Sequence, residues 1–329
     1  MEGINVETVT TNDDGAGCFN KKPTGLPVEE SGVIRWYFPK RREFYKYSPD
    51  LGRWLTEHVR ECDLLHIHAL FSHASVAAAR SAQRTGVPYV IRPLGTLNRY
   101  GVEQRRPWLK RLSLSFIEGP ILRHAAAVHF TTEAERVEAE RLGIPMNGLV
   151  IPLGITSQPP GNADAVYDLY PQLRDDRLLL FLSRLDPVKN VEGLLQAFSQ
   201  SVQNIPDLSL VIAGDGEPGY VGSLKRLAEK LGLSAHVLWT GYVEGNQKRD
   251  LLAAASVFVL PSYSENFGIA AAEALMAGVP CILGEGVAIA NDVEAAQAGF
   301  VTSTDSKDIA HALVKIFEDN GQLDQMGIG

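Results

Sequence analysis

The chain has 329 residues, of which 45% are hydrophobic and 21% charged, and its formal net charge is −8. This composition is typical of a globular protein, and the length suits two α/β domains better than one core. No apolar run reaches the roughly 20 residues of a spanning helix. Residues 1–160 carry 20 Lys and Arg against 17 Asp and Glu, whereas residues 161–329 carry 11 against 22. This acidic second half argues against nucleic-acid binding, which needs a basic footprint.

The three cysteines, Cys18, Cys62 and Cys281, are isolated and have no C-x-x-C spacing. Such spacing predicts reduced thiols rather than a disulfide framework or a zinc site. The N-terminus also lacks the pattern of a signal peptide. We therefore expect a cytoplasmic protein.

The first half alternates strand-like and helix-like patterns. We expect strands at 4–10, 33–38, 62–68, 88–92, 125–131 and 148–153, helices at 48–59, 74–85 and 133–142, and a loop at 17–33. Alternation of this kind predicts a parallel sheet wound on both faces, with ligands at the carboxyl ends of the strands. His68 and Arg92 stand at two such ends.

The second half repeats the alternation. We expect strands at 178–182, 208–213, 237–240, 253–260 and 280–283, and helices at 191–202, 221–231, 247–254 and after Gly268. Residues 157–176, before the first of these strands, contain Pro159, Pro160 and Pro171 and are typical of a connection between domains. The predicted organisation is an N-terminal domain of residues 1–156, a linker of residues 157–176 and a C-terminal domain of residues 177–329.

Two glutamates, Glu265 and Glu273, are separated by seven residues across the end of a strand and the start of a helix. Two carboxylates placed in this way can accept hydrogen bonds from the hydroxyls of one polar ligand such as a nucleotide sugar. The alternative is that Glu265 caps the helix and Glu273 is a solvated helix residue. The helix around Glu273 is apolar, however, so this glutamate is expected to have a partner.

Two further loops follow strands of the second half. Arg184 and Lys189 suit the two phosphates of a diphosphate, whereas the alternative for this loop is a surface pair between Arg184 and Asp186. The run Gly214-x-Gly216-x-x-Gly219 has the form of a dinucleotide fingerprint. We reject that interpretation because the next strand ends without an acidic residue and Pro218 removes an amide from the phosphate cradle. A glycine-permitted turn beside another ligand is the preferred interpretation.

These motifs together resemble the retaining glycosyltransferases of family 4. The matching segments are S-R-L-D-P-V-K at 183–189, A-G-D-G at 213–216, T-G-Y-V at 240–243 and S-E-N-F-G-I-A-A-A-E-A-L-M-A-G-V-P at 264–280. The resemblance implies the α/β fold called GT-B, in which two Rossmann-like doubly wound parallel-sheet domains face a cleft. Members usually begin with a further strand, a Gly-rich loop and a helix, and end with a helix that returns to the first domain, so the resemblance also implies that these elements are missing here.

The resemblance also implies roles for individual residues. Arg184 and Lys189 would hold the donor diphosphate, Glu273 the ribose and Glu265 the donor sugar. His68 would be the active-site histidine, although a core pair of His66 and His68 is the alternative. The other donor-side candidates are Gly214, Tyr242, Val243, Asn266, Phe267, Gly268 and Ile269, and the weaker acceptor-side candidates are Arg92, Gly95, Thr96 and His73.

The expected activity is transfer of a hexose, with UDP-glucose as the best guess at the donor, to a glycan or lipid-linked glycan in polysaccharide biosynthesis. No D-x-D motif occurs in the sequence, so we expect neither a metal nor another cofactor, with Arg184 and Lys189 neutralising the leaving group. The alternatives are a non-catalytic remnant that binds nucleotide sugars and a GT-B-type nucleotide-sugar epimerase.

A basic segment at residues 99–117 carries Trp, Leu and Phe at near-helical spacing among five basic residues and one acid. A helix of this kind can lie on the anionic inner face of a membrane, or it can pack its apolar stripe against its own domain. A second basic cluster at residues 35–60, with seven positive and three negative residues, favours peripheral membrane association.

Overall fold

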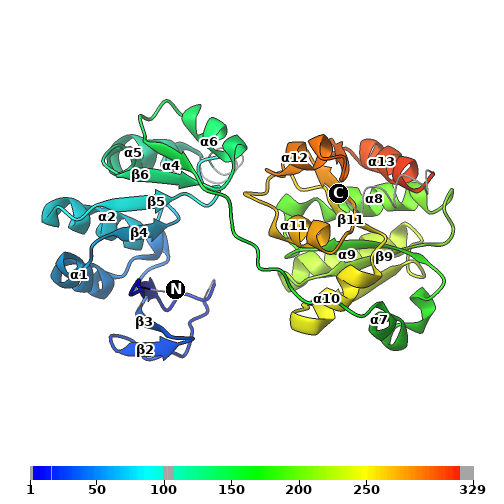
Figure 1. Cartoon of the computed structure of the whole chain (residues 1–329), viewed down its shortest axis with the longest axis horizontal. Helices are drawn as coiled ribbons and strands as arrows, with labels where there is room; N and C mark the ends of the chain where they lie inside the picture. Colours follow the sequence, from blue (N-terminus) through cyan, green and yellow to red (C-terminus); the bar gives the residue numbers. More distant parts are fainter. Residues whose placement is uncertain (1–2, 16, 99–101, 103–106, 319–329) are drawn as a thin grey trace. The chain divides into compact units, whose positions relative to one another are not determined.

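The computed structural model describes residues 3–15, 17–98, 102 and 107–318. The chain divides into two compact units, Met1–Pro152 and Leu153–Gly329 (Figure 1). Both units are α/β, and the sheet of the second is entirely parallel.

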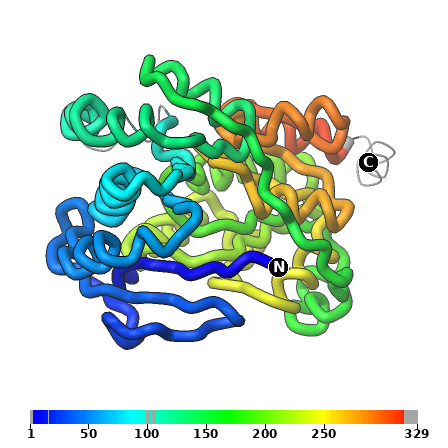
Figure 2. Tube along the Cα trace, turned by 60° about the vertical axis from the view of Figure 1, so that its left-hand side comes forward, coloured from blue at the N-terminus to red at the C-terminus, as the bar shows by residue number. Residues whose placement is uncertain are grey.

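The first unit begins with a small three-stranded sheet in the order β1-β3-β2. Its strands are β1 (Glu7–Thr11), β2 (Pro27–Glu30) and β3 (Val33–Phe38). β1 runs parallel to β3, but β2 is antiparallel to it, and the hairpin lies at the blue end of the trace (Figure 2). The expectation of a loop throughout residues 17–33 was therefore wrong. Ser31 and Gly32 both have positive φ, which is what a two-residue hairpin turn requires.

A second sheet of the first unit holds the strands with the acceptor-side candidates. Its order is β4-β5-β6-β7, all parallel: β4 (Leu65–His68), β5 (Tyr89–Arg92), β6 (Ala127–Phe130) and β7 (Gly148–Val150). The helical segments are η1 (Phe44–Lys46), α1 (Pro49–His58), η2 (Val59–Glu61), α2 (His73–Thr85), α4 (Pro107–Ser113), the π-helical η3 (Leu114–Glu118), α5 (Gly119–Arg123) and α6 (Glu133–Glu140). The strands of this unit thus form two separate sheets instead of one.

The two faces of the β4–β7 sheet differ in burial. Ile67, Ile91 and Val128 point to the core and are at most 6% exposed. Side chains alternate along a strand, so His66 and His68 point to the other face, where both are exposed.

The second unit is a six-stranded parallel sheet in the order β10-β9-β8-β11-β12-β13. Its strands are β8 (Arg177–Leu182), β9 (Leu208–Ala213), β10 (Val237–Gly241), β11 (Val257–Leu260), β12 (Cys281–Gly284) and β13 (Gly299–Thr302). Every residue of β9, β11 and β12 is buried, as expected for apolar strands of a parallel sheet covered on both faces.

Helices connect these strands. They are α7 (Ala163–Leu169), η4 (Pro171–Leu173), η5 (Pro187–Lys189), α8 (Val191–Ser201), α9 (Pro218–Lys230), α10 (Gly245–Ala254), α11 (Ile269–Met276), α12 (Ala290–Ala295) and α13 (Ser306–Glu318). The chain winds outward from β8 through β9 to β10 and then returns to β11 before winding the other way. The carboxyl ends of β8 and β11 therefore meet at a topological switch point, where open α/β sheets bind their ligands.

The segment between the units is only partly irregular. Residues 151–162 carry no helix or strand, but α7 lies inside the stretch that we expected to be linker. The Asn162 amide donates to Oδ1 of Asp250 on α10 at 2.7 Å, and the Asn162 side chain caps α7. These contacts place α7 in the second unit.

Candidate functional site

The loops that follow β8 and β11 carry two oppositely charged candidates. Lys189 ends η5, and its side chain is 10% exposed, while that of Glu265 is 22% exposed. The Lys189 ammonium donates a hydrogen bond to Oε2 of Glu265. The Tyr263 amide also donates to the Val188 carbonyl at 2.9 Å, so the backbones of the two loops are hydrogen-bonded to each other. The switch point therefore presents a compact lysine–glutamate pair.

Glu265 does not cap the helix that follows it. Gly268 is the N-cap of α11, with φ of 92°, and a Cβ there would lie 2.9 Å from Val287. A positive φ and so little space make glycine the suitable residue. The Glu265 backbone instead pairs with Gly286 and Ala288, which leaves its carboxylate directed to Lys189. The capping alternative was wrong.

Glu273 lies on α11, and the expected partner is present. Nζ of Lys248, on α10, donates to Oε1 of Glu273 at 2.6 Å. The two side chains are 28% and 21% exposed, so the pair is mostly shielded from water. The neighbouring Ala271 and Ala274 are fully buried, which explains why a glutamate at this position needs a charged partner. Glu273 is not the freely solvated residue of the alternative interpretation.

Arg184 differs from the other charged candidates because it is exposed. No ion pair joins it to Asp186 or to any other residue that the structure describes. Asp186 instead caps η5 through the Val188 amide. Arg184 is thus a cation on the loop after β8 that is open to an anionic ligand.

The loop with Gly214 runs alongside the loop with Arg184. The Leu185 amide donates to the Asp215 carbonyl at 2.8 Å, and a Cβ at Gly214 would meet the Ser183 carbonyl oxygen at 1.9 Å. The close approach of the two backbones therefore requires glycine at position 214.

The amino end of α9 is already occupied by a carboxylate. Glu217 accepts hydrogen bonds from the amides of Gly219 and Tyr220 at 3.0 and 2.8 Å, and these bonds lower the pKa of its carboxyl group. A dinucleotide would place its pyrophosphate at this helix end. The carboxylate supports our rejection of a dinucleotide fingerprint.

The remaining donor-side candidates differ in exposure. Tyr242 is 70% exposed and its hydroxyl donates to Glu244, whereas the Val243 side chain is 8% exposed and packs in the core. A ligand beside this loop would therefore meet the backbone of Val243. Of the residues around the start of α11, Ile269 is 51% exposed, and Asn266 and Phe267 are partly exposed.

In the first unit, His68 belongs to a row of histidines on the open face of the β4–β7 sheet. The rings of His66 and His68 are 4.5 Å apart, and those of His66 and His129 are 5.6 Å apart. Desolvation and the nearby His68, His129 and Arg92 lower the pKa of His66 to about 4, and desolvation and Arg92 also lower the pKa of His68. A neutral imidazole can donate and accept hydrogen bonds at neutral pH. The alternative of a core pair was wrong, because both side chains are exposed.

The weaker acceptor-side candidates lie in two places. Arg92 ends β5 and shares the His68 face, and its Nε is buried without a partner among the described residues. Gly95 donates its amide to Glu135, and the Thr96 hydroxyl donates to the Pro93 carbonyl. His73 begins α2.

The His73 ring does not face the histidine row. It packs edge-on against Tyr47 at 4.6 Å, and a Cβ at Gly52 of α1 would lie 3.2 Å from it. Burial also lowers the pKa of His73. These contacts describe a residue that packs between helices.

Sequence reasoning missed three residues. The first is Lys248, which pairs with Glu273. The second is Glu135, which is buried on α6 and accepts hydrogen bonds from the amides of Gly95 and Thr131. Glu118 is fully buried and accepts from the Phe71 amide and the Tyr45 hydroxyl at 3.1 and 2.6 Å, so it holds the loop after β4. A glutamate inside an apolar run is the signal that identified Glu273, and it would also have found Glu118 in L-S-F-I-E-G-P-I-L.

The part of the chain that the structure describes contains no group of three or more metal-binding side chains suited to one ion. Within the same residues, no helix combines the length and the apolar character needed to cross a bilayer.

Two family models match the chain. Residues 2–154 match the glycosyl transferase 4-like domain, and residues 171–328 match the glycosyl transferases group 1. Together the matches span nearly the whole sequence.

Individual relatives are more distant. A putative teichuronic acid biosynthesis glycosyltransferase TuaC of Bacillus subtilis is 30% identical over 76% of this chain and 63% of its own length. D-inositol 3-phosphate glycosyltransferase 2 of Catenulispora acidiphila is 31% identical over 51% of this chain and 41% of its own. A phosphatidyl-myo-inositol mannosyltransferase of Mycobacterium tuberculosis is 28% identical over 66% of this chain and 64% of its own length. The chain thus spans less than two thirds of the length of these relatives.

Solved structures share the fold. HepE of Anabaena, crystallised with UDP and glucose, aligns with a TM-score of 0.74 at 19% identity over 90% of this chain and 80% of its own. Sucrose-phosphate synthase of Thermosynechococcus elongatus aligns with a TM-score of 0.77 at 22% identity over 99% of this chain and 82% of its own. The two family matches together span nearly the whole chain and the fold agrees with them, so this chain belongs to the family-4 type glycosyltransferases with the GT-B fold.

Proposed function

We propose that this chain transfers a hexose from a nucleotide diphosphate sugar to a glycan or lipid-linked glycan in polysaccharide biosynthesis. The observation that carries the proposal is the set of charged side chains at the switch point of the second unit: the exposed Arg184 and the ion pairs Lys189–Glu265 and Lys248–Glu273. This set combines cations with hydrogen-bond acceptors, which matches a ligand that carries both phosphates and hydroxyls.

The donor diphosphate would bind to Arg184 and Lys189. Its charge would compete for the Lys189 ammonium, so Glu265 would exchange its lysine for hydroxyls of the donor sugar. Glu273 would accept hydrogen bonds from the ribose. UDP-glucose remains the best donor candidate, and the UDP and glucose bound to HepE support testing it first.

The reaction would retain the configuration at the anomeric carbon. The acceptor oxygen would bond to that carbon on the face from which the phosphate oxygen departs, and the acceptor proton would pass to the leaving phosphate. The positive charges of Arg184 and Lys189 would stabilise the negative charge that develops on the leaving group, which is the part that a divalent ion plays in metal-dependent transferases.

A helical face in the first unit supports an acceptor at a membrane surface. Trp108, Leu112 and Phe116 recur every four residues along α4 and η3 and are 64%, 51% and 74% exposed. Exposed Arg111 lies on the same turn as Leu112. Apolar side chains next to a cation suit the interface of an anionic bilayer. Of the basic segment 99–117, residues 99–101 and 103–106 lie outside the described residues.

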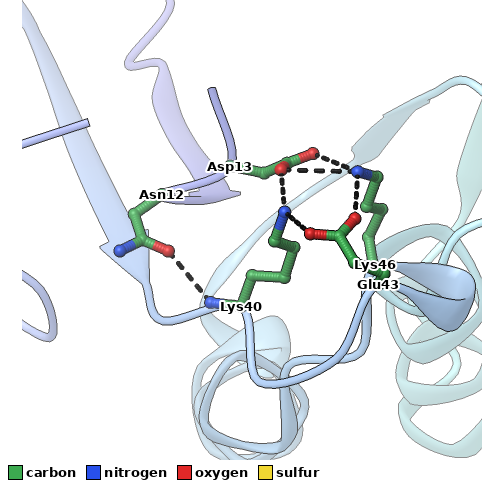
Figure 3. A network of polar contacts seen from close by, with 5 residues as sticks. All are labelled: Asn12, Asp13, Lys40, Glu43 and Lys46. Atoms are coloured by element: carbon green, nitrogen blue, oxygen red, sulfur yellow. Dashed lines mark hydrogen bonds and ion pairs between the residues drawn. The ribbon is translucent and has the colours of Figure 1, made fainter. Parts of the chain in front are cut away.

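The second basic cluster, residues 35–60, supports this proposal less than its composition indicated. Five of its seven cations form ion pairs, namely Arg35, Lys40, Arg41, Lys46 and Arg53. In Figure 3, Lys40 and Lys46 share the carboxylates of Asp13 and Glu43, and the Lys40 side chain is only 2% exposed. Charges neutralised within the fold attract a membrane weakly, so the proposed contact is limited to the face of Trp108, Leu112 and Phe116.

A donor panel tests the activity. The purified chain is incubated with UDP-, GDP- and ADP-hexoses, with and without lipid-linked and soluble glycan acceptors, and mass spectrometry follows the nucleoside diphosphate and the sugar. Acceptor-dependent release from one donor is the expected result. Binding of UDP without even slow hydrolysis of any donor would favour the non-catalytic remnant, and conversion of one donor sugar into another without an acceptor would favour an epimerase.

A further inference from the structure

Each carboxylate of the Glu265/Glu273 pair contacts its own lysine. The partner of Glu265 comes from the loop after β8, whereas the partner of Glu273, Lys248, comes from α10, the helix between β10 and β11. Lys248 lies four residues beyond Glu244, at the end of the loop with Tyr242 and Val243. None of the motifs at the switch point includes Lys248.

The geometry of the second pair leaves half of the Glu273 carboxylate available. Nζ of Lys248 bonds Oε1, and Oε2 has no hydrogen-bond partner among the described residues. A carboxylate carries about four acceptor positions on its two oxygens. One ammonium can therefore fix the orientation of the group and still leave acceptor positions for two hydroxyls.

The surroundings of Glu273 explain why orientation matters. The side chain is 21% exposed on a helix in which Ala271 and Ala274 are buried. A mostly shielded carboxylate costs free energy unless it is paired, and a single rotamer held in advance lowers the entropy lost on binding. Without Lys248 the carboxylate would turn toward water or another donor, and its alignment with a ligand would be lost.

We propose that Lys248 is a positioning residue that holds the Glu273 carboxylate ready to accept hydrogen bonds from the two ribose hydroxyls of the donor nucleotide. The proposal rests on the proposed function, in which Glu273 binds the ribose. Lys248 acts through Glu273, so its effect depends on the ribose hydroxyls and not on the phosphates.

Calorimetry with UDP and with 2′-deoxy-UDP tests this dependence, because the second nucleotide lacks one of the hydroxyls. Four proteins are compared: the unmodified chain, Lys248→Met, Lys248→Arg and Lys230→Met. The last is the matched control, since Lys230 is an exposed residue at the end of α9 in the same unit and undergoes the same loss of charge.

The unmodified chain is expected to prefer UDP over 2′-deoxy-UDP. Lys248→Met should weaken UDP by about tenfold, the effect of losing one charge-assisted contact, and should weaken 2′-deoxy-UDP clearly less, because only its 3′ hydroxyl remains to bind Glu273. Lys248→Arg should restore most of the preference, and Lys230→Met should match the unmodified chain. Thermal unfolding of each variant checks that it folds. If Lys248→Met does not fold, Lys248→Arg still tests the proposal, because it keeps the positive charge beside Glu273.

Two results would overturn the proposal. An equal loss of affinity for both nucleotides in Lys248→Met would indicate that Lys248 binds the diphosphate. Unchanged affinity for both would indicate that the ion pair with Glu273 only links α10 to α11. Failure of the proposed function gives a different result, in which the unmodified chain binds none of UDP, GDP and ADP.

Discussion

The ammonium of Lys189 and the carboxylate of Glu265, which are 76 residues apart in the sequence, are joined by a hydrogen bond at the switch point of the second unit. Their loops follow β8 and β11, the two adjacent strands at which the direction of winding reverses. Under the proposed function, a diphosphate that takes Lys189 would release Glu265, so we expect binding of the phosphates to be coupled to recognition of the sugar through this pair.

Replacement of Lys189 tests the diphosphate clamp. Lys189→Ala should lower kcat/KM by roughly 10² or more, from the loss of about 3 kcal/mol of transition-state stabilisation. Steady-state kinetics with the donor found in the panel measure it, and Lys230→Ala is the control for loss of a surface charge. Full activity in Lys189→Ala, or an absolute requirement for Mg²⁺ or Mn²⁺, would remove the clamp from the mechanism.

The two glutamates should have separable effects. Glu273→Gln should weaken UDP itself, because the amide loses the negative charge and one acceptor site for the ribose hydroxyls. Glu265→Gln should spare UDP affinity and lower transfer, because its proposed ligand is the sugar. Calorimetry with UDP and kinetics with the UDP-sugar separate the two, and equal losses of UDP affinity would contradict the division.

The exposed face of α4 and η3 should bind anionic vesicles. We expect the chain to cosediment with phosphatidylglycerol-containing liposomes at low salt and less so at high salt. Trp108→Ser/Phe116→Ser should weaken the binding, while Leu26→Ser, another exposed apolar residue of the first unit, should not. Absence of cosedimentation at low salt would contradict membrane association and make a soluble glycan the better acceptor candidate.

The His66 pKa of about 4 predicts a pH dependence of stability. In an unfolded chain the pKa of a histidine is about 6.5. Between about pH 4 and 6.5 the unfolded state therefore binds more protons than the folded state, and the free energy of unfolding falls as the pH falls. The loss begins below pH ~6.5 and is complete below the folded pKa. His66→Gln should reduce this loss between pH 7 and 5, whereas His311→Gln, an exposed change on α13, should not.

Tryptophan fluorescence during denaturant unfolding measures the effect, because three of the four tryptophans, Trp36, Trp54 and Trp108, lie in the same unit as His66. His68 has a lowered pKa as well, so part of the loss should remain in His66→Gln. A pH dependence in His66→Gln equal to that of the unmodified chain would contradict the prediction.

The sequence by itself determined most of the second unit. Its first five strands are continuous apolar runs bounded by loops, because a parallel sheet buried on both faces leaves little choice of residue. The sixth strand, β13, was not predicted. The same alternation places Arg184, Lys189 and Glu265 at strand ends, since loops after parallel strands open on one edge. An isolated glutamate in the apolar helix at 269–276 also indicated a partner for Glu273.

Tertiary structure decided which groups meet. Nothing local joins Lys248 to Glu273 or Phe71 to Glu118, because these contacts depend on how separate elements pack and not on periodicity. The division of the first unit into two sheets was equally hidden, since each strand pattern is the same whichever neighbour it pairs with. The charge of residues 35–60 was read from composition, but ion pairs within the fold decided how much of it remains free, because Coulomb attraction depends on distance and burial.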